Sequence, residues 1–169
     1  MIKPDTWIEN FGKGGGITPF LEDNINPASY DVRLSDSWVE AQVCPITGKL
    51  AWAPLTSKVY VLRPGEVVLA STIEYFHLPH DVAADLKLKS TLGRSWINHT
   101  LAGWVDPGFQ GTVTMELQNI GKLPYTLEYG TRVAQLIFMS IDGVCGCPYG
   151  KGGKGRYHRQ VGATTPRTS

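Results

Sequence analysis

The residues best suited to chemistry lie in one stretch, 99–119, where a turn leads into a strand that carries a single carboxylate. Residues 106–108, DPG, indicate a turn, because proline presets the second turn position and glycine accepts dihedral angles that other residues resist. From 112 to 118 polar and apolar residues alternate, which places Glu116 on the polar face of a predicted strand. An active-site role for Glu116 needs evidence beyond this alternation. The alternative is a solvated strand glutamate, because half-buried strands usually expose one face to water.

A second candidate group is the segment 89–94, KSTLGR. We expect Ser90 to cap a short helix through its hydroxyl, with Arg94 one turn further on the same face. A cation and a hydroxyl beside a helix N-terminus form a favourable phosphate environment. The alternatives are a purely structural cap for Ser90 and a surface ion pair for Arg94.

The elements that must position these groups are mostly strands. A short helix is expected at 6–11, ended by the glycines that follow, and a half-buried strand at 30–35 with Asp31 and Arg33 on its polar face. Residues 44–57 indicate a turn-rich excursion. Further strands are expected on both sides of the turn at 63–65 and at 82–88, 125–128 and 132–141. Eight or more strands with few helices predict an all-β jelly roll or related β-barrel.

Length and composition narrow the class of protein. A chain of 169 residues fits a single domain, 1–169. A net charge of +1 gives no general footprint for nucleic acid, although 151–159 is locally basic. The sequence contains no apolar run of the roughly 20 residues that a membrane span needs, so we expect no membrane partner and a cytoplasmic location.

The cysteines do not indicate a metal centre. Three cysteines cannot all pair internally, and we interpret them as reduced thiols. Cys145 and Cys147 flank one glycine, but no second pair of suitable spacing completes a four-ligand zinc site.

The C-terminal segment 149–169 differs from the rest, with almost no aliphatic residues and abundant Gly, Lys and Arg. Two interpretations remain open from composition. It is either a disordered, solubilising end, or a lid that folds over an anionic ligand with glycine hinges and basic side chains.

Four segments in a fixed order, KSTLGR, AGWVDPGFQGTVTMEL, GTRVAQLIF and YHRQVGA, resemble the dCTP deaminase family of the trimeric dUTPase superfamily. The resemblance begins with ITPFLEDNINPASYDVRLSDSW and covers nearly the whole chain. It implies a distorted jelly roll or β-barrel of the β-clip type, a homotrimer with active sites between subunits, and deamination without zinc. The sequence agrees, since it lacks the His-x-Glu and Pro-Cys-x-x-Cys pattern of zinc deaminases.

The resemblance also implies roles for individual residues. Glu116 would take a proton from water and pass it on as ammonia leaves, which works best if burial raises its pKa. Ser90, Arg94 and the backbone around Ala102 would surround the reactive end of the base and orient the water. The remaining substrate contacts implied are Lys89 and Thr91 with the triphosphate, Leu92 and Gly93 in the same segment, Asp106 with the 3′-hydroxyl, Thr114 and Met115 with the base edge, and Gln135 with the nucleotide. Tyr149, Arg156 and Gln160 match lid residues that close over the phosphates, and Arg156 stands where lysine is more usual.

Gly103-Trp104 resembles the Gly-aromatic form of family members that also cleave the triphosphate, which implies a bifunctional enzyme. Such an enzyme would convert dCTP to dUTP and then to dUMP and diphosphate, with Mg²⁺ held through the triphosphate rather than by a protein metal site. The alternative for Trp104 is a packed core aromatic. Leu101 departs from the family, which usually has threonine there, and this puts regulation and tolerance for 5-substituted cytosines in question.

Three hypotheses therefore compete. The first is a dCTP deaminase, bifunctional or deaminating only. The second is a dUTP diphosphatase, which would share the barrel, Asp106 and Gln135 but needs no Glu116. The third is a non-catalytic nucleotide-binding regulator on the same barrel, which the presence of Ser90, Arg94 and Glu116 disfavours.

Overall fold

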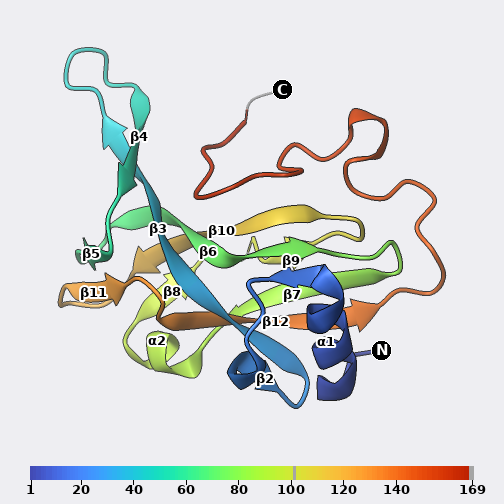
Figure 1. The fold of residues 1–169 in the computed structure, drawn as a ribbon. Helices are drawn as coiled ribbons and strands as arrows, with labels where there is room; N and C mark the ends of the chain where they lie inside the picture. Colours follow the sequence, from blue (N-terminus) through green and yellow to red (C-terminus); the bar gives the residue numbers. More distant parts are fainter. Residues whose placement is uncertain (101, 168–169) are drawn as a thin grey trace.

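Antiparallel strands dominate the protein, whose computed structural model describes residues 1–100 and 102–167 (Figure 1). The prediction of an all-β fold with a few short helices is confirmed, and the strands expected at 82–88 and 125–128 have those bounds. The strands described are β1 (Ile17–Thr18), β2 (Ile25–Asn26), β3 (Ser29–Val43), β4 (Leu50–Thr56), β5 (Val59–Leu62), β6 (Val67–His77), β7 (Val82–Leu88), β8 (Ile97–His99), β9 (Trp104–Val105), β10 (Gln110–Asn119), β11 (Tyr125–Glu128) and β12 (Arg132–Ser140).

The α-helices α1 (Asp5–Phe11) and α2 (Ser90–Arg94) are short, as are the one-turn segments Gly12–Gly16, Glu22–Asn24 and Lys151–Gly153. Within the described residues, no helix is both long and apolar enough to cross a membrane. The prediction that Ser90 caps α2 is wrong. Lys89 holds the cap position, with the extended dihedral angles that a cap needs, and no side chain bonds the helix end.

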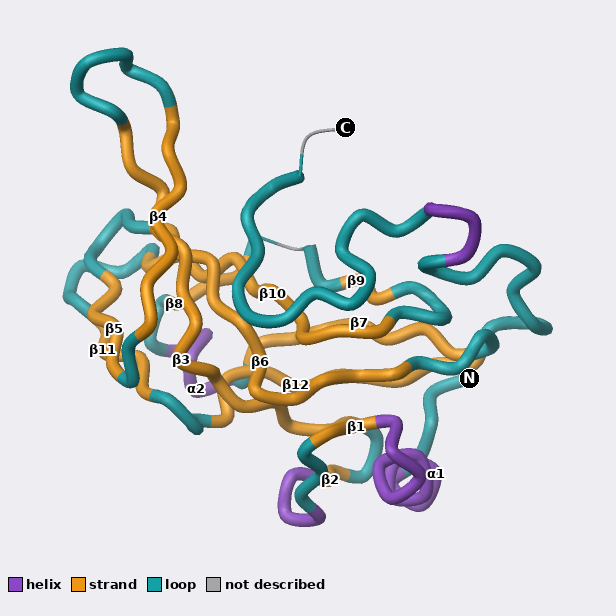
Figure 2. The backbone as a smooth tube through the Cα atoms, turned by 45° about the horizontal axis from the view of Figure 1, so that its top comes forward, coloured by secondary structure: helices purple, strands orange, loops and turns teal. Residues whose placement is uncertain are grey.

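Strand β3 joins the two halves of the fold. Its first part pairs with β12 and its last part with β4, and β6 pairs along its other edge. β12 leads on to β7 and β9, while β6 leads on to β10 and β8. The sheet curls so that both halves enclose one apolar core (Figure 2). The order β8–β10–β6–β3–β4 decides which side chains lie beside Glu116.

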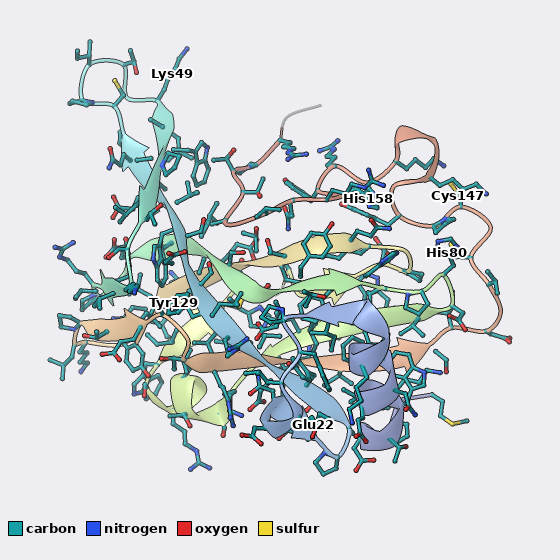
Figure 3. The ribbon with its side chains drawn as sticks, in the orientation of Figure 1. Glu22, Lys49, His80, Tyr129, Cys147 and His158 are labelled. Atoms are coloured by element: carbon teal, nitrogen blue, oxygen red, sulfur yellow. The ribbon has the colours of Figure 1, made fainter. Side chains whose placement is uncertain are left out.

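The segment 44–57 is not the turn-rich excursion that the sequence predicts, because it contains β4, which pairs with β3 from Ser37 opposite Thr56 to Val43 opposite Leu50. Pro54 makes this strand hard to predict from sequence, because proline has no N–H to donate to the neighbouring strand. It is tolerated because β4 lies at the edge of the sheet. The tip of the β3–β4 hairpin projects from the body of the protein, with Lys49 at its far end (Figure 3).

The expected half-buried strand at 30–35 is buried on both faces. Tyr30 and Val32 are 0% exposed, and Asp31, on the face predicted to be polar, is only 3% exposed. Its carboxylate accepts hydrogen bonds from the Lys89 ammonium at 2.5 Å and the Asn26 side-chain amide at 2.9 Å. These partners explain how a carboxylate can be held in the interior.

Candidate active site

A cavity of about 480 Å³ opens between β10, the segment before it and the C-terminal tail, and its size lies within the usual range for small-molecule sites. Four separate stretches of the sequence contribute to its lining: β4, β6, the segment that ends in β10, and the C-terminal tail. The predicted site residues that line the cavity are Ala102, Trp104, Asp106, Thr114, Glu116, Tyr149 and Gln160.

Glu116 is the acidic group in the middle of β10. Its neighbours Met115 and Leu117 point into the core, at 1% and 0% exposure, so the Glu116 side chain emerges on the cavity face and is half-buried. Burial raises the pKa of the Glu116 carboxyl above its ordinary value, and a hydrogen bond from its own backbone N–H opposes part of this shift. A carboxyl group whose pKa is raised by burial holds a proton more readily than a solvated one, as proton transfer requires.

A β-bulge precedes Glu116. The pairing of β10 with β6 shifts between Thr112, opposite Tyr75, and Thr114, opposite Ser71. The backbone N–H of Val113 donates to the Thr72 hydroxyl at 2.9 Å instead of to the ladder. The bulge lets Val113 line the cavity together with Thr114 and Glu116, which strict alternation would not allow.

The predicted turn at 106–108 is confirmed. The Phe109 N–H donates to the Asp106 carbonyl at 3.1 Å, and Gly108 has φ +84°, which is typical of the third position of a type II turn. The turn leaves the Asp106 side chain exposed in the cavity, where its carboxylate accepts a hydrogen bond from the Trp104 indole at 3.0 Å. Asp106 and Glu116 thus line the same cavity.

Gly103 and Trp104 precede the turn and differ in their surroundings. A Cβ on Gly103 would stand 2.7 Å from the Leu86 carbonyl oxygen, so only glycine lets this segment approach β7 as closely as it does. Trp104 is 58% exposed and lines the cavity, so the alternative of a packed core aromatic is wrong within this chain.

The C-terminal tail lies across the start of β10. The Gln160 side-chain amide donates to the Thr112 carbonyl at 2.8 Å, and the Thr112 N–H donates to the Gln160 carbonyl at 3.0 Å. Further along, the Thr164 N–H donates to the Thr114 hydroxyl at 3.3 Å. Tyr149 and Gln160 thus form part of the cavity wall.

The group at 89–94 does not reach this cavity. Ser90, Thr91, Gly93 and Arg94 are exposed on α2, and Leu92 is buried in the core at 3% exposure. Figure 1 shows α2 on the side of the sheet away from the tail. The Lys89 ammonium is paired with the Asp31 carboxylate. The side chain of Gln135 accepts a hydrogen bond from the Ser29 hydroxyl at 2.8 Å. Within one chain the predicted site residues therefore form two separate groups.

Three other predicted residues lie elsewhere. Met115 is 1% exposed, so only its backbone could meet a ligand. Arg156 is exposed on the tail, where its guanidinium donates to the Arg167 carbonyl at 3.5 Å, and it does not line the cavity. Leu101 lies outside the described residues.

Sequence reasoning missed the apolar wall of the cavity. This wall contains Trp52 from β4, Val67 and Leu69 from β6, and Phe109 after the turn. The alternation in β6 could indicate which of its residues share a face, but not that β6 pairs with β10. Trp52 could not be found because its segment carries no clear strand pattern.

No group of three or more His, Cys, Asp or Glu side chains that could hold a metal ion occurs in the part of the chain that the structure describes. The three cysteines have free thiols, and Cys147, just before the tail, is exposed (Figure 3).

Comparisons with known proteins find relatives of this chain. The sequence profile of dCTP deaminase-like proteins matches residues 2–141. A dUMP-forming dCTP deaminase of Corynebacterium efficiens is 42% identical over 161 residues, which cover 88% of this chain and 83% of that protein. A protein of the same description from Mycobacterium ulcerans is 38% identical, covering 90% and 87% of the two chains.

Solved structures share the fold. The 2′-deoxycytidine 5′-triphosphate deaminase of Agrobacterium tumefaciens superposes with a TM-score of 0.69 at 23% identity, over 83% of this chain and 48% of that one. A dUTPase of Staphylococcus bacteriophage 80alpha superposes with a TM-score of 0.51 at 16% identity, over 70% and 79% of the two chains.

Proposed function

This chain belongs to the dCTP deaminase-like family, and on that premise we propose that it hydrolyses dCTP to dUTP and ammonia and then cleaves dUTP to dUMP and diphosphate. The observation that carries the proposal is the position of Glu116. It is half-buried, has a raised pKa and lines one cavity with Asp106 and Ala102. A solvated strand glutamate would have neither the burial nor the cavity.

The deamination follows from what Glu116 can do. Its carboxylate removes a proton from a water molecule, and the resulting hydroxide attacks C4 of the cytosine ring. The attack forms a tetrahedral centre at C4 and places negative charge on N3. The carboxyl group then returns its proton to the amino group, which leaves as ammonia, and the proton of the C4 hydroxyl moves to N3 as the C4 carbonyl forms. Since one group acts first as base and then as acid, a pKa raised toward neutrality suits both steps.

Asp106 and the tail would hold the rest of the substrate. In this proposal the Asp106 carboxylate accepts a hydrogen bond from the 3′-hydroxyl of the deoxyribose, which fixes the direction from the sugar to Glu116. Tyr149 and Gln160 cover the nucleotide from the tail and exclude bulk water, as lids commonly do. The exposed Arg156 would approach the phosphates if the tail shifts when the nucleotide binds.

The two separate groups of residues support a homotrimer. Ser90 and Arg94 do not line the cavity of their own chain, yet both are exposed on α2, where they could face another copy. In a closed ring of identical subunits, the α2 of one copy would complete the Glu116 cavity of the next. Lys89, Thr91, Gly93 and Gln135 would then lie with Ser90 and Arg94 on the phosphate side of the shared site.

The second reaction requires charge neutralisation on the triphosphate. Mg²⁺ binds proteins through few carboxylates plus substrate phosphates, so a site without a cluster of protein ligands in its described residues fits a metal held through the nucleotide. When bound, Mg²⁺ would stabilise the negative charge of the departing diphosphate. Lys89 and Arg94 would orient the phosphate oxygens by charge-assisted hydrogen bonds.

The proposal is tested by product analysis. The protein is incubated with dCTP and Mg²⁺, and ammonia, dUTP, dUMP and diphosphate are measured together. Equal yields of ammonia, dUMP and diphosphate are expected. Ammonia with dUTP alone would restrict the function to deamination, hydrolysis of added dUTP without ammonia from dCTP would favour a diphosphatase, and binding without any product would favour a regulator.

A further inference from the structure

The two sides of Glu116 differ in chemistry. On one side lies the segment that follows β8, where the Thr100 N–H donates to the Glu116 carbonyl at 3.3 Å and Ala102 lines the cavity. On the other side lies β6, with Leu69 directly opposite Glu116. Cross-strand partners have Cβ atoms about 5 Å apart, so the Leu69 side chain stands beside the carboxyl group on the same face.

This asymmetry orients a cytosine ring. Its N3 and O2 need hydrogen-bonding partners, which the irregular backbone around Thr100 and Ala102 can offer. Its C5–C6 edge needs none and is best matched by an apolar wall such as Leu69. If the sugar lies at Asp106 and C4 faces Glu116, then C5, which is bonded to C4, faces β6.

The apolar wall continues past Leu69. Val67 lies two residues earlier on β6, on the same face, and is 37% exposed. The next position across the sheet, on β3, is Ala41, since Glu40 pairs with Val68. Trp52 of β4 stands directly opposite Ala41, whose methyl group leaves room for the indole to lean toward Val67. Trp52, Val67 and Leu69 all line the Glu116 cavity.

We propose that Trp52, Val67 and Leu69 form an apolar recess that accepts a small apolar group on C5 of the pyrimidine, so that 5-methyl-dCTP is a substrate, and that Trp52 determines this specificity. The inference rests on the proposed deamination at Glu116 but goes beyond it. It makes Trp52 a specificity-determining residue outside the reacting centre, contributed by the strand nearest the exposed hairpin tip.

Binding and chemistry are separated by using Glu116→Gln, which keeps the shape of the side chain and removes the base. On this background, 5-methyl-dCTP is expected to bind about fourfold tighter than dCTP, because one buried methyl group contributes that much. Adding Trp52→Ala is expected to bring the two dissociation constants to within about twofold, and Trp52→Phe is expected to retain most of the preference.

Ile46→Ala is the matched control, since Ile46 lies at the tip of the same hairpin, is 92% exposed and does not line the cavity. It should leave the ratio of dissociation constants unchanged. The wild-type protein should release ammonia from both nucleotides. If it releases ammonia from dCTP but binds and turns over 5-methyl-dCTP far more weakly, the recess is refuted while the proposed function stands. If neither nucleotide releases ammonia, the proposed function itself fails.

An unchanged ratio in Trp52→Ala, with the variant folded by circular dichroism, would also refute the role of Trp52. Trp52→Phe controls for misfolding of the Trp52→Ala variant, because it keeps an aromatic side chain at this position of β4. If both Trp52 variants and Ile46→Ala bind 5-methyl-dCTP more tightly than dCTP by the original ratio, other residues determine this preference and the inference is overturned.

Discussion

The side-chain amide of Gln160 donates to the backbone carbonyl of Thr112 at 2.8 Å, which fastens the C-terminal tail to β10 four residues before Glu116. Gln160 is only 7% exposed, and its side-chain oxygen, Oε1, has no hydrogen-bond partner within the described residues. A bound nucleotide with a hydroxyl or a water molecule at this point could satisfy that oxygen.

Replacing Gln160 with alanine should therefore weaken nucleotide binding. The loss of one hydrogen bond of about 1.4 kcal/mol corresponds to a rise of about tenfold in KM for dCTP, while the backbone bonds of the tail remain. Steady-state kinetics measure the change, with Val161→Ala, at a 77% exposed position, as the neighbouring control. Equal KM values for the two variants would show that the tail does not act as a lid.

Mixing two inactive variants tests whether the site is shared between subunits. Glu116→Gln and Arg94→Ala should each be inactive alone. When they are unfolded together and refolded as mixed trimers, about a quarter of the sites should combine an intact Glu116 with an intact Arg94 from another chain. Ammonia release from dCTP measures the recovery. No recovery in trimers shown to be mixed by mass spectrometry would place both residues in the site of one chain.

The pKa of Glu116 predicts the acid side of the pH profile. The reaction starts with the carboxylate, so its rate falls as the pH drops through the pKa of this group. Burial raises this pKa, and the midpoint of kcat at saturating dCTP should therefore lie above 4.5, the ordinary value for a glutamic acid. Saturating dCTP is used because KM also reflects ionisation of the terminal phosphate. A midpoint at or below 4.5 would contradict a desolvated base.

The buried pair Arg33–Glu74 should be the most sensitive electrostatic element of the fold. Glu74 is 0% exposed, and its carboxylate accepts from the Arg33 Nε at 2.7 Å and from the Arg33 backbone N–H at 2.9 Å. Glu74→Ala leaves a buried guanidinium unpaired, which should cost about 3–5 kcal/mol in free energy of unfolding.

Chemical denaturation measures this loss. Glu9→Ala is the control, because it removes an exposed pair with Lys13 one helical turn away and should change the free energy of unfolding by about 0.5 kcal/mol or less. Similar losses in the two variants would mean that the buried pair contributes no more than a surface pair.

Much of the fold follows from local sequence patterns. The alternation in β10 and β7 and the proline and glycine residues at 106–108 predict strands and a turn that the structure contains. β4 could not be predicted, because it is a strand only through its pairing with β3, and Pro54 reads as a breaker until its edge position is known. The burial of Asp31 was missed for a related reason, since its partner Lys89 is 58 residues away.

The candidate site was only partly predictable. Motif order places Glu116, Asp106 and Gln160 in one site, and the structure brings all three to one cavity. The same order adds Ser90 and Arg94, but the structure places them outside this cavity, on α2. The order of motifs along the chain does not determine where they lie in space. The apolar wall of Trp52, Val67 and Leu69 depends on sheet register, which no local pattern encodes.

The central claim is that Glu116 is the acid–base group of a deamination that needs no protein-bound metal. The most direct measurement is ammonia release from dCTP by Glu116→Gln, compared with the wild-type protein and with trimer assembly checked by light scattering. Loss of the base should lower the rate by at least about 100-fold while the trimer stays intact and still binds dCTP. A Glu116→Gln trimer that releases ammonia at a rate near that of the wild-type protein would contradict the account.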